Sequence, residues 1–134
     1  MATIVQRIQT FLQTPRGRQL AAAGANSLRT WGVSDDLGAR LDEAHRLGLS
    51  VTVGLWLGHA RHGFDYADAA QVAAQKERVR QDVLRFKDHP AVLMWGIGNE
   101  MEGFGDGDDP AIWAEVNRVA AMVKELDPHH PTMT

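Results

Sequence analysis

The pair Asn99–Glu100 is the part of this sequence whose residue types and position best suit a chemical reaction. It directly follows an apolar run, AVLMWGIG, that spans residues 91–98. A carboxyl group at the end of an apolar strand is partly desolvated, which favours its protonated form and suits it to general acid catalysis. The neighbouring amide of Asn99 can hydrogen-bond a substrate hydroxyl. The alternative for Glu100 is a solvated loop carboxylate that takes no part in chemistry.

Three tryptophans recur, one for each apolar strand that the sequence predicts. Trp31, Trp56 and Trp95 lie near the ends of these strands, and flat indole faces suit the C–H faces of sugar rings. The alternative for each ring is packing in the hydrophobic core, which we expect for Trp113 because it lies in a predicted helix. The three strand tryptophans are therefore candidate substrate-binding residues.

Basic side chains also lie near predicted strand ends. Arg29 can hold a carboxylate in its ionised form, or it can form a structural ion pair with the next loop. His59 and His62 could both ligate zinc, but their spacing alone supplies no third ligand. We therefore expect no metal or other cofactor, and we expect the imidazoles, His59 more than His62, to serve as polar groups of the site.

Two further groups of potential metal ligands have simpler interpretations. The spacing of Asp106, Asp108 and Asp109 does not match a calcium-binding loop, and Asp109 before a proline is typical of a helix N-cap. His129–His130 is typical of a solvated turn.

Strands and helices alternate along the chain and must position these residues. The predicted strands are residues 26–32, 49–58 and 91–98, with the start of another at 131–134. The predicted helices are residues 3–13, 15–23, 37–47, about 72–86 and 110–126. The second and third strands are apolar almost throughout, which is typical of strands buried on both faces, and residues 34–36 are predicted to cap the helix that follows them. This alternation predicts an α/β fold with a parallel sheet, in a single domain over residues 1–134.

Composition limits the class of protein. The 134 residues are 44% hydrophobic and 23% charged, as in a globular domain with its own core. The net charge of −3 does not favour nucleic acid or an anionic membrane as a partner. The absence of cysteine excludes disulfides and thiolate catalysis. Because no apolar run reaches about 18 residues and the first residues show no signal-peptide pattern, we expect a cytoplasmic protein without a membrane span.

Four segments of the sequence resemble consecutive βα units of retaining glycoside hydrolases with a TIM barrel, the clan that includes families 2 and 5. They are AGANSLRTWG, LDEAHRLGLSVTVGLWLGH, RFKDHPAVLMWGIGNE and VNRVAAMVKELDPHHPTMT. The resemblance implies that Asn99 and Glu100 end the fourth barrel strand. It further implies that Glu100 is the catalytic acid/base, that Asn99 binds the sugar 2-hydroxyl, and that Arg29 and His59 are site residues at the ends of strands two and three.

The same resemblance implies a partial, or half, TIM barrel with flanking helices. The chain corresponds to strands two, three and four and the opening of strand five, with the N-terminal helices replacing strand one. The family nucleophile, a Glu at the end of strand seven, is absent from these residues, and retaining hydrolysis needs both carboxylates.

We therefore expect a glycoside hydrolase-like enzyme with a carbohydrate substrate, active only as a homodimer or higher homo-oligomer. One alternative is a metal-assisted hydrolase that uses His59, His62 and Glu100. The other is a non-catalytic fragment that binds carbohydrate through its tryptophans.

Overall fold

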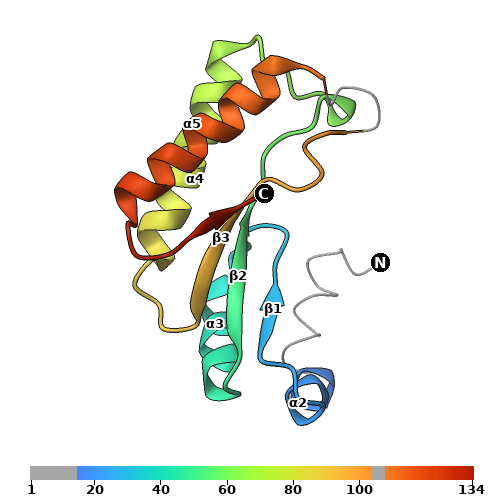
Figure 1. Cartoon of the computed structure of the whole chain (residues 1–134), viewed down its shortest axis with the longest axis vertical. Coiled ribbons are helices and arrows are strands. Elements are labelled where there is room, and N and C mark those ends of the chain that lie inside the picture. The colour runs from blue at the N-terminus through green and yellow to red at the C-terminus, as the bar shows by residue number, and fades with distance from the viewer. Residues whose placement is uncertain (1–14, 104–107) are drawn as a thin grey trace.

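Four parallel strands form one sheet in the order in which they follow along the chain. The computed structural model describes residues 15–103 and 108–134 (Figure 1). The strands are β1 (Ser27–Arg29), β2 (Ser50–Leu55), β3 (Val92–Ile97) and β4 (Thr132–Met133). Each strand pairs in parallel with the next, in the order β1-β2-β3-β4. This confirms the predicted parallel α/β sheet, and it is the arrangement of consecutive strands in part of a TIM barrel.

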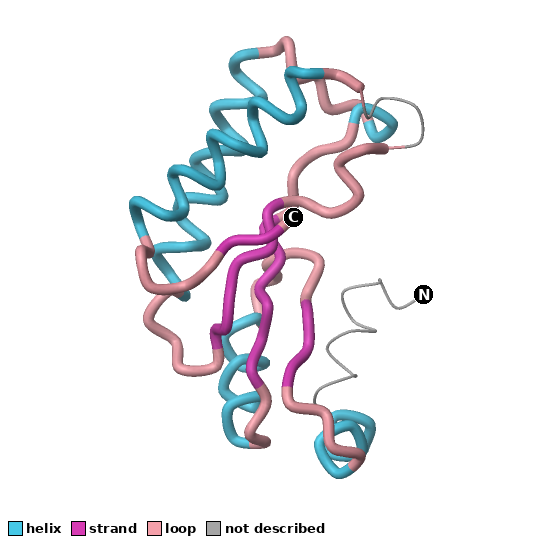
Figure 2. Tube along the Cα trace, viewed as in Figure 1, coloured by secondary structure: helices cyan, strands magenta, loops and turns pink. Residues whose placement is uncertain are grey.

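Helices connect the successive strands. They are α3 (Leu37–Arg46) between β1 and β2, α4 (Ala69–Phe86) between β2 and β3, and α5 (Pro110–Leu126) between β3 and β4. Figure 2 shows α4 and α5 running side by side, and the two helices are in contact. Ahead of β1 lies α2 (Pro15–Ala22), and the short 3-10 helix η1 (Ala60–His62) lies in the loop after β2. The helix expected over residues 3–13 falls outside the described residues, and among those described no helix is long and apolar enough to cross a membrane.

Side-chain capping sets the start of α4 and of α5 but not that of α3. Asp68 accepts hydrogen bonds from the first amides of α4, and Asp109 accepts one from α5, as expected of N-caps. The predicted N-cap of α3 falls at Asp36, but the Asp36 side chain makes no capping hydrogen bond to the helix backbone. Its carboxylate instead accepts from the Ser34 hydroxyl at 2.6 Å and from Arg40 Nε at 2.8 Å. Burial opposes the ionisation of Asp36, but these hydrogen bonds outweigh it and lower the pKa of its carboxyl.

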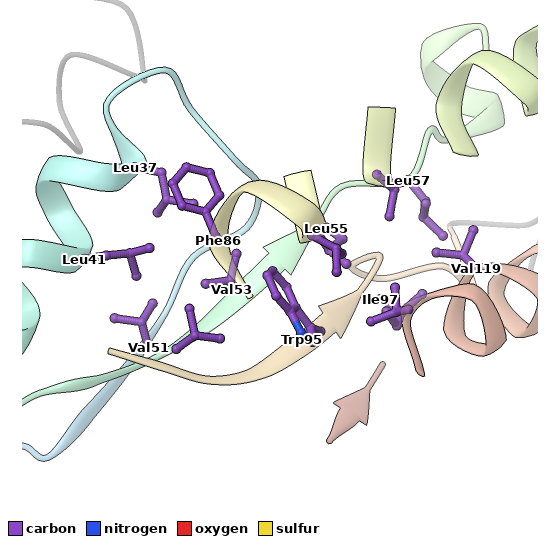
Figure 3. Packing of buried hydrophobic residues seen from close by; sticks show 14 of the residues in the cluster. Leu37, Leu41, Val51, Val53, Leu55, Leu57, Phe86, Trp95, Ile97 and Val119 are labelled. Atoms are coloured by element: carbon purple, nitrogen blue, oxygen red, sulfur yellow. The ribbon is translucent and has the colours of Figure 1, made fainter. Parts of the chain in front are cut away.

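The core lies between the sheet and the three connecting helices. Figure 3 shows Val51, Val53 and Leu55 of β2 packed with Trp95 of β3 and with Phe86 at the end of α4. These β2 side chains alternate along the strand and are at most 1% exposed, as expected for the buried face of a strand. All residues of β2 after the first are buried, which confirms the burial predicted for this strand.

The first half of β3 is less buried than its apolar sequence predicts. The register between β2 and β3 shifts after Val51, whose partner is Val92, so that Thr52 pairs with Met94 and Leu93 has no partner on β2. Such a bulge turns one residue away from regular pairing. Leu93 is 40% exposed in consequence, so the expectation of burial on both faces is wrong at this position.

Candidate active site at the carboxyl ends of the strands

Arg29 joins the first strand to the turn that carries Asn99 and Glu100. The Arg29 guanidinium NH2 donates a hydrogen bond to the carbonyl oxygen of Gly98 at 3.2 Å. Its Nε and NH2 atoms also lie 3.6 Å from where a Cβ on Gly96 would stand. The side chain therefore spans from β1 over β2 to the end of β3. Arg29 is thus brought to the turn that carries Asn99 and Glu100, although its hydrogen-bond partner is the Gly98 carbonyl rather than the carboxylate that we expected.

Gly54 allows the chain after β1 to pass closely over the sheet. A Cβ on Gly54 would stand 2.3 Å from the carbonyl oxygen of Thr30 and 2.6 Å from the carbonyl carbon of Trp31. The Gly54 amide donates to Thr30 Oγ1 at 3.0 Å, and the Thr30 amide donates to Thr52 O at 3.0 Å. Only glycine leaves room for this approach. Sequence reasoning missed Gly54, for which the only signal was a glycine inside a strand.

Glu100 has an unusual backbone conformation. Its φ of 52° makes it the one non-glycine residue with positive φ among those described, a conformation that is uncommon for residues with a Cβ. The side chain is 58% exposed, and Oε2 lies 3.7 Å from NH2 of Arg61. The partial desolvation expected at the end of an apolar strand is therefore not found. Arg61, which sequence reasoning missed, comes from η1 in the loop after β2, and its only signal was a basic residue between the two histidines.

His59 belongs to the same loop and directly precedes η1. It is 5% exposed, and its ring packs 5.1 Å from the ring of Trp56 and 5.8 Å from that of His62. Its Nε2 atom is buried and has no hydrogen-bond partner among the described residues. A cavity of about 30 Å³ adjoins it, and Met101 and Ile112 are among the residues that line this cavity. Because so little of the imidazole is exposed, this conformation does not give His59 the direct substrate contact that we expected.

The three candidate tryptophans differ in their surroundings. Trp31 is 65% exposed and Trp56 is half-buried, so both present ring surface near the strand ends. Trp95 is 0% exposed, and its indole Nε1 donates to Asp127 Oδ2 at 2.8 Å. The prediction of substrate binding is therefore wrong for Trp95, because its ring belongs to the core. The reverse holds for Trp113, which was expected in the core and is 39% exposed.

Asp127, at the C-terminal end of α5, binds the side chain of Trp95 in β3. This buried carboxylate accepts from Trp95, from His130 Nδ1 at 2.7 Å and from the backbone amides of His129 and His130 at 3.2 Å. Burial opposes its ionisation, but the hydrogen bonds from Trp95 and His130 prevail and lower the pKa of Asp127 to about 2. His129 is exposed, as a solvated turn would have it, whereas the partly buried His130 is bonded to the buried Asp127. The sequence indicated Asp127 only as the end of a helix.

A metal site among the histidines is not formed. Within residues 15–103 and 108–134, no three His, Asp or Glu side chains come together in a way that could hold a metal ion. His62 is exposed and packs against His59 instead. The alternative of a metal-assisted hydrolase built on His59, His62 and Glu100 is therefore not supported by this geometry.

Comparison with known proteins adds to this description. Residues 25–133 match the family described as glycosyl hydrolases family 2, TIM barrel domain. The chain is 31% identical over 85 residues to a probable mannan endo-1,4-beta-mannosidase C of Aspergillus terreus, covering 55% of this chain and 21% of that protein. It is 36% identical over 56 residues to mannan endo-1,4-beta-mannosidase F of Aspergillus clavatus, covering 42% of this chain and 13% of that protein. The matches thus span about a fifth or less of these relatives. Because the family match covers most of the chain and the four parallel strands fit it, the chain belongs to the TIM barrel domain family of the family 2 glycosyl hydrolases.

Proposed function

We propose that the chain is a glycoside hydrolase half-barrel in which Glu100 is the general acid/base. The observation that carries the proposal is the turn after β3. It places an exposed carboxylate beside Asn99, in a chain whose residues 25–133 match a glycosyl hydrolase barrel. In this proposal Glu100 protonates the leaving oxygen of a glycosidic bond, and Asn99 binds a neighbouring sugar hydroxyl.

Other groups at the same end of the sheet would hold the sugar. Arg29, fixed on the Gly98 carbonyl, is a donor beside the turn, and the exposed face of Trp31 suits the C–H face of a sugar ring. Trp56 presents a smaller surface. The relatives are named as enzymes that act on mannan, so we propose a β-1,4-linked mannan or its oligomers as the first carbohydrate to test.

Hydrolysis also requires a second carboxylate. The four strands are half of the eight in a TIM barrel, and in the family the nucleophile follows one of the other strands. We propose that a second copy of the chain associates along the open sheet edges and completes a shared cavity. Two Glu100 side chains about 6.5–9.5 Å apart would suit inversion with water between them. In the same proposal, α2 and the residues that precede it take the place of the first barrel strand.

Turnover of an activated aryl β-mannoside by the wild-type chain and by Glu100→Gln tests the catalytic role. We expect Glu100→Gln to lose at least about a hundredfold in kcat, because acid/base catalysis contributes about 10²–10⁴. Glu102→Gln is the matched control, since it makes the same change two residues away at an exposed position. Equal turnover by Glu100→Gln and wild type would refute the role of Glu100.

Molar mass by size exclusion with light scattering tests the association. A dimer or larger closed assembly is the expected result, and a monomer that turns over substrate would overturn this part of the proposal.

Sugar binding without turnover is the second candidate function, and the 65% exposure of Trp31 favours it. Saturable binding of mannooligosaccharides that Trp31→Ala weakens, with no hydrolysis by any assembly, would establish binding in place of catalysis.

A further inference from the structure

Two side chains hold the peptide groups of Gly58, one at its amide and the other at its carbonyl oxygen. The Gly58 amide donates to Gln75 Oε1 of α4 at 2.6 Å, and the Tyr66 hydroxyl donates to the Gly58 carbonyl oxygen at 2.7 Å. A Cβ on Gly58 would stand 2.3 Å from the ring of Phe64, and this ring packs 4.7 Å from the ring of Tyr66. We call Gln75 and Tyr66 the Gly58 clamp.

The segment that follows the clamp reaches the proposed catalytic carboxylate. Gly58 is directly followed by His59 and by η1, whose Arg61 lies 3.7 Å from Glu100. Within the segment, the amides of His62 and Phe64 donate to the carbonyl oxygen of His59 at 2.9 and 3.2 Å. Hydrogen bonds within residues 59–64 therefore hold this segment in one conformation, and the clamp fixes the position of Gly58 at its start. A shift of Gly58 would move Arg61 relative to Glu100.

Gln75 of the clamp and the nearby Glu115 each have a buried polar atom without a hydrogen-bond partner among the described residues. Gln75 is 2% exposed, and its Nε2 has no hydrogen-bond partner among the described residues. Glu115 of α5 is 1% exposed, with one oxygen paired to Arg118 at 2.9 Å and the other unpartnered among these residues. Burial raises the pKa of the Tyr66 hydroxyl, the nearby side chain of Gln75 acts against this rise, and the Glu115 carboxylate adds to it. Buried polar atoms without partners destabilise a fold, so stability alone does not explain them.

We propose that Gln75 and Tyr66 are positioning residues for Glu100. They hold the Gly58 peptide and thereby set the place of Arg61 against the Glu100 carboxylate. This inference rests on the proposed function of Glu100 and extends it to two residues that lie on α4 and in the loop after β2. Neither residue needs to touch substrate in this role.

Gln75→Met tests the clamp, because it keeps the size of the side chain and removes the acceptor. Gln81→Met is the matched control on the same helix, at an exposed position whose partner is Glu77. With an aryl β-mannoside, we expect Gln75→Met to lower kcat about tenfold or more with little change in KM, since small displacements of catalytic groups carry such losses. Gln81→Met should leave both constants unchanged, and urea unfolding of both variants corrects for the folded fraction.

Amide exchange and NMR spectra provide a readout that does not depend on turnover. We expect Gln75→Met to speed exchange of the Gly58 amide at least tenfold and to shift the resonances of Arg61 and Glu100. Tyr66→Phe should give the same shifts if Gln75→Met fails to fold. A wild-type chain without turnover would refute the proposed function. The NMR shifts would still show whether Gln75 and Tyr66 set the position of Arg61 against Glu100. Unchanged Gly58 exchange with unchanged Arg61 and Glu100 resonances would overturn the clamp, even if Glu100 proved catalytic.

Discussion

Because of the buried carboxylate of Asp127, the free energy of unfolding of this domain should fall at acid pH. The pKa of Asp127 is lowered from 3.8 to about 2 in the folded chain, where the side chain is 3% exposed. At about 1.4 kcal/mol for each pH unit, this difference corresponds to roughly 2.5 kcal/mol of folding free energy. Because the folded-state pKa is the lower one, the contribution is present above pH 3.8 and is lost as the pH falls from 3.8 toward 2.

Asp127→Asn removes the charge and keeps the shape of the side chain. We expect it to lower the free energy of unfolding by about 2 kcal/mol at pH 7, measured by urea denaturation, and the difference from wild type to shrink as the pH approaches 2. Asp88→Asn is the matched control, because Asp88 is 86% exposed and its ion pair within the described part of the chain is with its neighbour Lys87. Such exposed pairs contribute little. An Asp127→Asn variant with the same pH dependence as wild type below pH 4 would refute the reasoning.

Three further substitutions test the backbone, at Gly54 and Glu100 of the site and at Gly38 of α3 for comparison. Gly54→Ala should destabilise the fold by about 3 kcal/mol or more in urea denaturation, because its Cβ would stand 2.3 Å from a backbone oxygen. Gly38→Ala in α3, where the Cβ would meet only Phe86 at 3.7 Å, should instead stabilise by about 0.5–1 kcal/mol, and equal effects of the two changes would contradict this argument. Glu100→Gly should raise the unfolding free energy by up to about 1 kcal/mol, since glycine tolerates a φ of 52°. A loss of stability there would show that the conformation carries no strain.

The order of the strands, and the edge of the sheet at which the candidate residues lie, followed from local sequence patterns. Apolar runs of strand length between amphipathic helices predict a parallel sheet, and parallel strands gather their carboxyl ends at one edge. These patterns were sufficient to predict that Arg29 and the Asn99–Glu100 pair lie at the same edge of the sheet. The cap at Asp109 was equally readable, because it depends on residues adjacent in the sequence.

Contacts between distant residues were not readable in the same way. Since β3 is apolar at every position, its sequence did not show which face Trp95 takes or that the register shifts near Leu93. Trp95 lies 32 residues from its partner Asp127 in the sequence, and Gln75 lies 17 residues from its partner Gly58. The exposure of Glu100 depends on the turn conformation, which the apolar run before it does not determine.

The strained turn itself links the fold to the proposed chemistry. A non-glycine residue held at positive φ costs free energy, and such residues persist where the surrounding structure determines them. Here Gly98 and Gly103 take positive φ on either side of Glu100, and Arg29 fixes the Gly98 carbonyl. A glycine in place of Glu100 would relieve the strain but would remove the carboxylate beside Asn99. The fold keeps a strained glutamate at this position and holds the turn with an arginine from another strand. Both features are explained if the turn serves to present the Glu100 carboxylate.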